Sequence, residues 1–160
     1  MSKFDAYKRL EYCLLISFLS LFSFSCSTSC RQWHLDEMIG SNDCYHSSRL
    51  YLLSEDAYCN LELVLIRSKS GIRMYLNTFS VPFPWESNDE CKTAIYLCVD
   101  GNEFAFVSDR LQGGQRLLLP PDAVELIIST LMNGEQLSVR AGRYQMVVIP
   151  TRFGELFLAK

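Results

Sequence analysis

The sequence predicts a mainly β fold of the α+β class, an antiparallel β-sandwich or open barrel with one packed helix at about residues 121–133. Three observations support this prediction. Short segments alternate between apolar and polar residues, as half-buried strands do. Turn residues separate these segments at short intervals. Only one segment after the first thirty residues repeats its apolar side chains at helical spacing.

The first expected strands lie between residues 50 and 81. A short strand is expected at 50–53 and a longer one at 58–67. The side chains of 58–67 that share one face are those of Cys59, Leu61, Leu63 and Leu65. A turn follows at 68–71, where Gly71 is free to adopt positive φ, and the partner strand is expected at 72–81.

A loop with two prolines at 82–89 ends this first group, because proline cannot donate to a β-ladder. The next two strands, at 93–99 and 103–107, are expected to form a hairpin. Their connection at 100–101 is Asp-Gly, a dipeptide that tight hairpin turns favour. A further short strand is expected at 117–119, directly before the helix.

The helix at 121–133 has recognisable ends. Proline suits its first turn, where an N–H group is not needed, and Asp122 favours the positive end of the helix. Gly134 follows its last turn, as glycine commonly does. The apolar residues that fall on one stripe of this helix are Val124, Ile127, Ile128 and Leu131. The sequence therefore predicts that this stripe packs against the sheet.

The last strands follow the helix. Residues 136–139 and 144–149 are expected to form a hairpin around Gly142, and residues 153–158 to add an edge strand. Seven or eight strands and one helix would then form a single domain at 50–160. Because 49% of the chain is hydrophobic, such a domain can build a core without a metal.

The first 25 residues indicate an export signal. Lys3, Lys8 and Arg9 precede an apolar run at 13–24, and small residues follow it. This run of about twelve residues is short for a spanning helix, which takes roughly twenty. Its apolar side chains lie on all sides of a helix, which argues against a helix buried in a small domain. We therefore expect residues 1–25 to be removed as a signal peptide.

Cys26 is expected to be the first, lipid-modified residue of the mature chain. The residues before it resemble a lipobox, although Ser23 and Phe24 stand where that motif has leucine and a small residue. The alternative site is Cys30, because its lipidation would leave an even number of thiols. Residues 26–49 are polar and without period, so they are expected to form a lipid-linked tether and an irregular lead-in.

Four further cysteines are the candidates for disulfide bonds: Cys44, Cys59, Cys91 and Cys98. Exported chains meet an oxidising compartment, and four cysteines allow three pairings. The most local pairing joins Cys44 to Cys59 and Cys91 to Cys98. Cys59 to Cys98 is awkward because they face opposite sides of their strands. Cys30 is left over and could bridge to another chain.

No catalytic set, metal site or cofactor is expected. The two histidines, His34 and His46, lie in the polar lead-in, and a pair of Cys44 with His46 is the one nucleophile–base candidate. Solvated side chains explain these residues more simply. No Cys-x-x-Cys spacing is present, which disfavours zinc. The net charge of −3 and the lack of a basic cluster argue against nucleic acid as a partner.

The segment 79–85 is the candidate binding site. Phe79, Phe83 and Trp85 stand in a proline-stiffened loop, and aromatic side chains on rigid loops lose little entropy when they contact a partner. The alternative is that these side chains form a hydrophobic plug that seals one end of the sheet, since most aromatic residues of a small domain are buried.

The short signal that ends at Cys26, with sparse cysteines in a Leu/Ser-rich chain, resembles the small envelope lipoproteins of chlamydiae. This resemblance implies a palmitate-bearing protein of a disulfide-rich envelope, facing the periplasm or the cell surface. A second similarity covers 93–158, where hairpin, helix and hairpin place 122–127 before 137–139. It resembles the invasion-associated locus B type of periplasmic β-domain, with Phe-Gly at 153–154 where that family has Gly-Phe.

These expectations together favour an exported lipoprotein of the bacterial outer membrane with a non-catalytic binding or scaffolding role. Its partners would be the membrane, through the lipid, and an envelope protein. Neither resemblance transfers a catalytic residue. The alternative is a secreted, unanchored effector or enzyme at the host–microbe interface, which would have a soluble mature form and a pocket with clustered polar groups.

Overall fold

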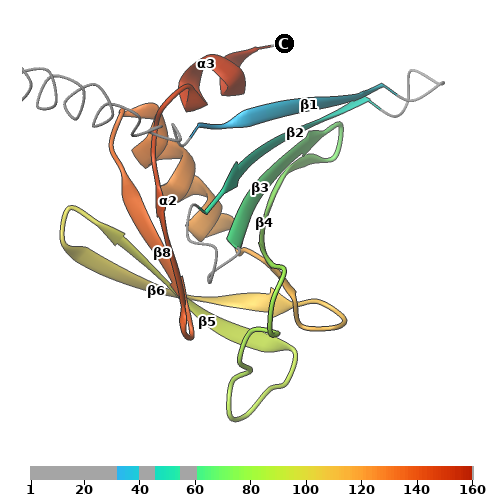
Figure 1. The fold of residues 1–160 in the computed structure, drawn as a ribbon, viewed down its shortest axis with the longest axis vertical. Coiled ribbons are helices and arrows are strands. Elements are labelled where there is room, and N and C mark those ends of the chain that lie inside the picture. The colour runs from blue at the N-terminus through green and yellow to red at the C-terminus, as the bar shows by residue number, and fades with distance from the viewer. Residues whose placement is uncertain (1–31, 40–45, 55–60, 160) are drawn as a thin grey trace, which may run out of the picture. The chain divides into compact units, whose positions relative to one another are not determined.

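The computed structural model describes residues 32–39, 46–54 and 61–159. The chain divides into two compact units, Met1–Cys30 and Arg31–Lys160, and the described residues all belong to the second. Its strands are β1 (His34–Ile39), β2 (His46–Leu53), β3 (Leu61–Ser68), β4 (Gly71–Thr78), β5 (Lys92–Val99), β6 (Asn102–Arg110), β7 (Arg116–Leu118), β8 (Leu137–Ala141) and β9 (Tyr144–Val148) (Figure 1). The helices are α2 (Pro121–Met132) and α3 (Phe153–Leu158).

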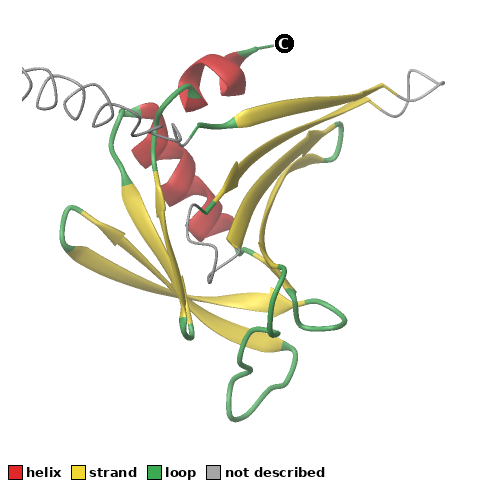
Figure 2. Cartoon of the chain, viewed as in Figure 1, coloured by secondary structure: helices red, strands yellow, loops and turns green. Residues whose placement is uncertain are grey.

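The nine strands form one antiparallel sheet in the order β1-β2-β3-β4-β7-β6-β5-β8-β9. The predicted fold class is confirmed: the domain is mainly β, with an open antiparallel sheet and a packed helix. Tight turns join β3 to β4 and β5 to β6, where Asp100 and Gly101 both have positive φ. Strands β1–β4 lie on one side of α2, and β5, β6, β8 and β9 on the other (Figure 2).

The core lies between the two halves of the sheet and the inner face of α2. Along β5 the side chains alternate, so that Ile95 and Leu97 are fully buried while their neighbours are half-buried. On α2, three residues of the predicted stripe are buried: Val124, Ile127 and Leu131. Burial of such side chains contributes about 1.5–3 kcal/mol each, so this core is the main source of the domain's stability. The fourth stripe residue, Ile128, is only partly covered.

The irregular lead-in expected before residue 50 is wrong in its structural part, because β1 and the first half of β2 occupy it. Trp33 explains why the segment is ordered. Its side chain is 1% exposed, its Nε1–H donates to the Ile149 carbonyl at 2.8 Å, and its ring lies 4.9 Å from that of Phe153. Trp33 therefore joins the start of the domain to the segment that follows β9.

The edge strand expected at 153–158 is also wrong, because these residues form α3. The rings of Phe153 and Phe157 stack with centroids 5.3 Å apart, a contact that four-residue helical spacing allows. The guanidinium carbon of Arg67 lies 4.6 Å from the centre of the Phe157 ring, and its Nη2 donates to the Phe157 carbonyl. The helix is therefore held from both of its ends.

A buried carboxylate, that of Glu62, lies in β3. Glu62 is 5% exposed, and its two oxygens accept bonds from Arg49 Nη2 at 2.6 Å and Asn77 Nδ2 at 2.7 Å. A buried charge is tolerated only when it is paired and hydrogen-bonded in this way. These two bonds link Glu62 of β3 to Arg49 of β2 on one side and to Asn77 of β4 on the other.

Candidate functional site

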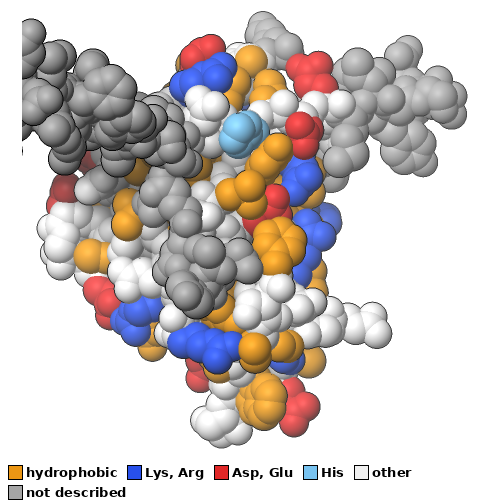
Figure 3. All heavy atoms as spheres, in the orientation of Figure 1, with side chains coloured by type: hydrophobic (Ala, Val, Ile, Leu, Met, Phe, Trp, Pro, Cys, Tyr) orange, Lys and Arg blue, Asp and Glu red, His pale blue; other side chains and the backbone are white. Residues whose placement is uncertain are grey.

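The loop between β4 and β5 presents apolar side chains to solvent. Phe79 is 62% exposed, Val81 53% and Trp85 59%, whereas Phe83 is 1% exposed. We call residues 79–85 the aromatic loop. Phe83 is buried, as the plug interpretation expects, whereas Phe79 and Trp85 are exposed; that they bind a partner stays a prediction. Figure 3 shows hydrophobic side chains at the lower end of the molecule.

Hydrogen bonds between the backbone of the aromatic loop and residues 110–115 hold the loop in place. The Phe83 amide donates to the Gly114 carbonyl at 2.8 Å, and Arg110 Nε donates to the Phe83 carbonyl at 3.1 Å. Gln115 Nε2 donates to the Ser80 carbonyl at 2.8 Å. The loop is thus fixed at several points along its length, so its exposed side chains are displayed from a rigid base.

Two side chains of the β8–β9 hairpin and β5 complete this base. The Tyr144 hydroxyl donates to the Val81 carbonyl, and the Tyr144 ring meets that of Phe83 edge-on with centroids 5.3 Å apart. Burial alone would raise the pKa of the Tyr144 phenol, but hydrogen bonds from neighbouring side chains, Arg143 first, outweigh it and lower that pKa. Thr93 Oγ1 donates to the Pro84 carbonyl at 2.7 Å.

Close packing also holds Pro84 of the loop in place. Gly142 has φ +58°, and a Cβ atom built on it would lie 2.5 Å from Cγ of Pro84. No larger residue fits there without a shift of the loop. On the outer side, the Arg110 guanidinium carbon lies 5.6 Å from the centre of the Trp85 ring, within the range of cation–π attraction. Trp85 is therefore oriented although most of its surface is exposed.

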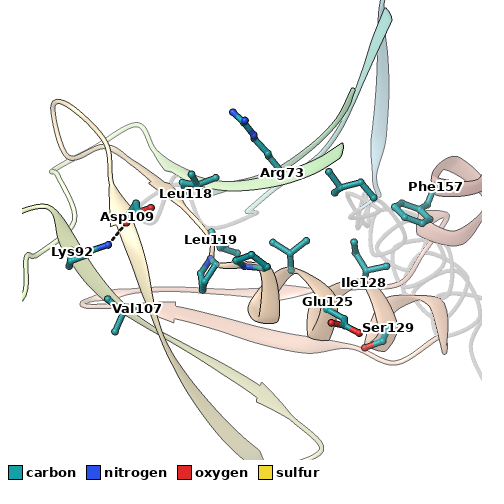
Figure 4. Close-up of a pocket in the computed structure, with 14 residues that line it drawn as sticks. Arg73, Lys92, Val107, Asp109, Leu118, Leu119, Glu125, Ile128, Ser129 and Phe157 are labelled. Atoms are coloured by element: carbon teal, nitrogen blue, oxygen red, sulfur yellow. Dashed lines mark hydrogen bonds and ion pairs between the residues drawn. The ribbon is translucent and has the colours of Figure 1, made fainter. Parts of the chain in front are cut away.

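A second feature, which we call the β4–β6 cleft, is an apolar cavity of about 800 Å³ (Figure 4). Its apolar lining includes Ile72, Val107, Leu118, Val124, Ile128 and Phe157. Lys92 and Asp109 form an ion pair at one side of it, and the hydrogen bond that Lys92 donates to this carboxylate raises the pKa of Lys92. Both members are largely exposed, so the pair contributes little to stability.

The cysteine predictions have mixed outcomes. Cys91 is exposed and Cys98 is half-buried, and both are free thiols, so the proposed bond between them is wrong. Cys98 comes seven positions after Cys91, β5 begins directly after Cys91, and an extended chain of seven steps covers about 23 Å. A disulfide needs Cα atoms about 4–7 Å apart. Cys26, Cys30, Cys44 and Cys59 lie outside the described residues.

Of the two histidines, His34 is the one whose side chain the structure describes. The ring of His34, in β1, stacks on that of Tyr51 with centroids 5.1 Å apart, and the candidate partner Cys44 of His46 is not described. Among the residues that the structure describes, no three His, Cys, Asp or Glu side chains are placed to hold a metal ion. In the same residues, no helix is long and apolar enough to cross a membrane.

Comparisons with protein-family models, with curated proteins and with solved structures found no match. The site is therefore characterised by its own geometry: a rigid loop with three exposed apolar side chains, and a separate apolar cleft. Sequence reasoning missed the cleft. Its one available signal was Ile128, which lies at the edge of the helical stripe rather than at its centre.

Proposed function

We propose that this chain is an exported bacterial envelope lipoprotein, lipidated at Cys26, whose β domain binds another envelope protein without catalysing a reaction. One observation carries the binding role: Phe79, Val81 and Trp85 are more than half exposed on a loop that is bonded to the sheet at several points. The export signal and the lipidated cysteine come from the sequence alone.

The exposed side chains of the aromatic loop favour association for two physical reasons. Burying apolar area stabilises a complex by roughly 25 cal/mol per Å², and aromatic anchors contribute most of the energy of many interfaces. The fixed backbone means that little further entropy is lost on binding. Exposed apolar groups gathered in one place are therefore more consistent with an interface than with a surface that only meets solvent.

Replacing Cys26 by alanine is expected to abolish lipid attachment, whereas Cys30→Ala should leave it intact. The reason is that the thiol of the first mature residue is the one that is acylated, and buried acyl chains hold a protein to a membrane. Incorporation of labelled palmitate and the intact mass of the mature chain measure this directly. Label that is lost from Cys30→Ala instead would move the site to Cys30, and an unlabelled wild type would refute the anchor.

Photocrosslinking tests the binding role of the aromatic loop. With p-benzoylphenylalanine in place of Trp85, illumination of intact cells is expected to give one discrete adduct with another envelope protein. Leu158 is the matched control position because it is 67% exposed and lies in α3, outside the loop. Equal adducts from both positions, or none from position 85, would count against this interface.

A further inference from the structure

The sheet splits between β4 and β6. Strand β7 lies between them, but β4 pairs with it only at 75–77, and β6 only at 109–110. One further bond joins the Leu119 amide to the Met74 carbonyl at 3.0 Å, and the chain then leaves the sheet for α2. Beyond this point no described strand pairs with 71–73 on the side of β4 away from β3, or with 102–108 on the side of β6 away from β5. The sheet therefore has room for a strand in line with β7.

The backbone of β6 offers unused hydrogen-bonding groups along this gap. A two-residue turn makes Val99 and Asn102, the residues that flank it, a hydrogen-bonded pair. Along an antiparallel ladder such pairs alternate with pairs whose N–H and C=O groups point away from the partner strand. The Arg110 amide, which donates to the Cys91 carbonyl at 2.7 Å, continues the same alternation. The N–H and C=O groups of Ala105 and Val107 therefore point away from β5, into the gap.

This edge also lacks the usual protection against pairing. Natural edge strands carry charges, prolines or bulges that prevent a foreign strand from adding. Between Phe104 and Ser108, β6 contains no charged residue and no proline. Phe104 is 41% exposed and Val107 is 56% exposed. An open edge of this kind is a liability unless it has an occupant.

The β4–β6 cleft lies at the same gap. Its lining includes Ile72 of β4, Val107 of β6, and Val124 and Ile128 of α2. Lys92 is neutralised by Asp109, while Arg73 of β4 and Glu125 of α2 form no ion pair with a described residue. The cleft therefore offers an apolar surface, a row of free backbone groups, and one unpaired charge of each sign on its two walls.

We propose that the β4–β6 cleft binds an extended peptide segment of a partner protein, which adds to the outer edge of β6 as a strand. Its alternate apolar side chains would lie on Val124 and Ile128, since successive side chains of a strand face opposite sides. An acidic residue near Arg73 would match the unpaired cation. A lipid chain would fill the cavity but would leave the backbone groups of β6 unpaired, so the peptide is favoured. This inference does not depend on the aromatic loop.

Selection of phage-displayed heptapeptides on the full chain, purified in mild detergent, tests the proposal. We expect enriched peptides that alternate apolar residues and carry an acidic residue near one end. Val107→Lys should weaken the binding of a selected synthetic peptide at least tenfold. Leu53→Lys is the matched control, because Leu53 of β2 is an apolar strand residue with 49% exposure that does not line the cleft. It should bind the peptide like the wild type.

Residue-resolved hydrogen exchange gives a second readout that strand addition alone would produce. In the bound state the amides of Ala105 and Val107 should exchange at least tenfold more slowly, while those of Phe104 and Phe106, which face β5, should change little. The proposal is overturned if no peptide is enriched, or if a peptide binds without slowing these amides. Palmitate that displaces the apolar dye anilinonaphthalene sulfonate where selected peptides do not would identify a lipid site instead and equally overturn it.

Discussion

Trp33→Ala is expected to lower the free energy of unfolding by about 3–5 kcal/mol, the range for truncating a buried aromatic residue. The indole is 1% exposed, contacts the Phe153 ring and donates a hydrogen bond to the Ile149 carbonyl. Its removal leaves a cavity and an unpaired carbonyl at the point where β1 meets the segment after β9.

Urea unfolding measures the effect, and the chain supplies its own control. Trp85 is the second of the two tryptophans and is 59% exposed, so Trp85→Ala should change the free energy of unfolding by no more than about 0.5 kcal/mol. Trp33→Phe keeps an aromatic ring but loses the N–H donor. Its loss in the free energy of unfolding should therefore lie between those of Trp33→Ala and Trp85→Ala. Similar losses in the free energy of unfolding for Trp33→Ala and Trp85→Ala would mean that the contacts of Trp33 with Ile149 and Phe153 do not stabilise the domain.

Much of the fold could be predicted because its strands are amphipathic on a local scale. Along β5 alternate side chains are buried, and the Asp100-Gly101 turn fixes its partner β6. α2 is bounded by proline and glycine, and three of its stripe residues are buried. In each of these elements the local pattern and the tertiary environment agree, which is the condition under which sequence reasoning succeeds.

The errors lie where tertiary contacts override the local pattern. The sequence of β1 is polar because β1 is an edge strand that contains Asp36 and Glu37. The long-range hydrogen bond of Trp33, which precedes it, explains why the segment is ordered. α3 is short and has an apolar spacing that also suits a strand. Phe153 packs on Trp33, and Phe157 packs under Arg67; these tertiary contacts favour the helix over the strand.

The candidate site could be predicted only in part, for a similar reason. Composition identified the aromatic loop, but the choice of Phe83 as the buried residue depends on Tyr144, which is distant in sequence. The β4–β6 cleft arises because β7 is too short to fill the space between its neighbours. Strand order is not encoded in alternation, so the sequence offers no direct sign of such a gap.

Phe83→Ala is the second substitution for which we expect a loss of about 3–5 kcal/mol in the free energy of unfolding. The Phe83 side chain is 1% exposed and packs edge-on against Tyr144. Its backbone accepts from Arg110 and donates to Gly114, so the cavity would open at the base of the aromatic loop. Phe79→Ala is the matched control, because Phe79 is 62% exposed in the same loop.

The two phenylalanine variants should separate stability from binding. Phe79→Ala is expected to keep the urea midpoint of the wild type and to weaken the photocrosslink formed from position 85, since it removes an exposed neighbour of that anchor. Phe83→Ala should lower the urea midpoint and also weaken the crosslink, because a loosened loop must lose entropy when it binds. If Phe83→Ala lowers stability but leaves the crosslink unchanged, rigidity of the loop does not contribute to partner binding.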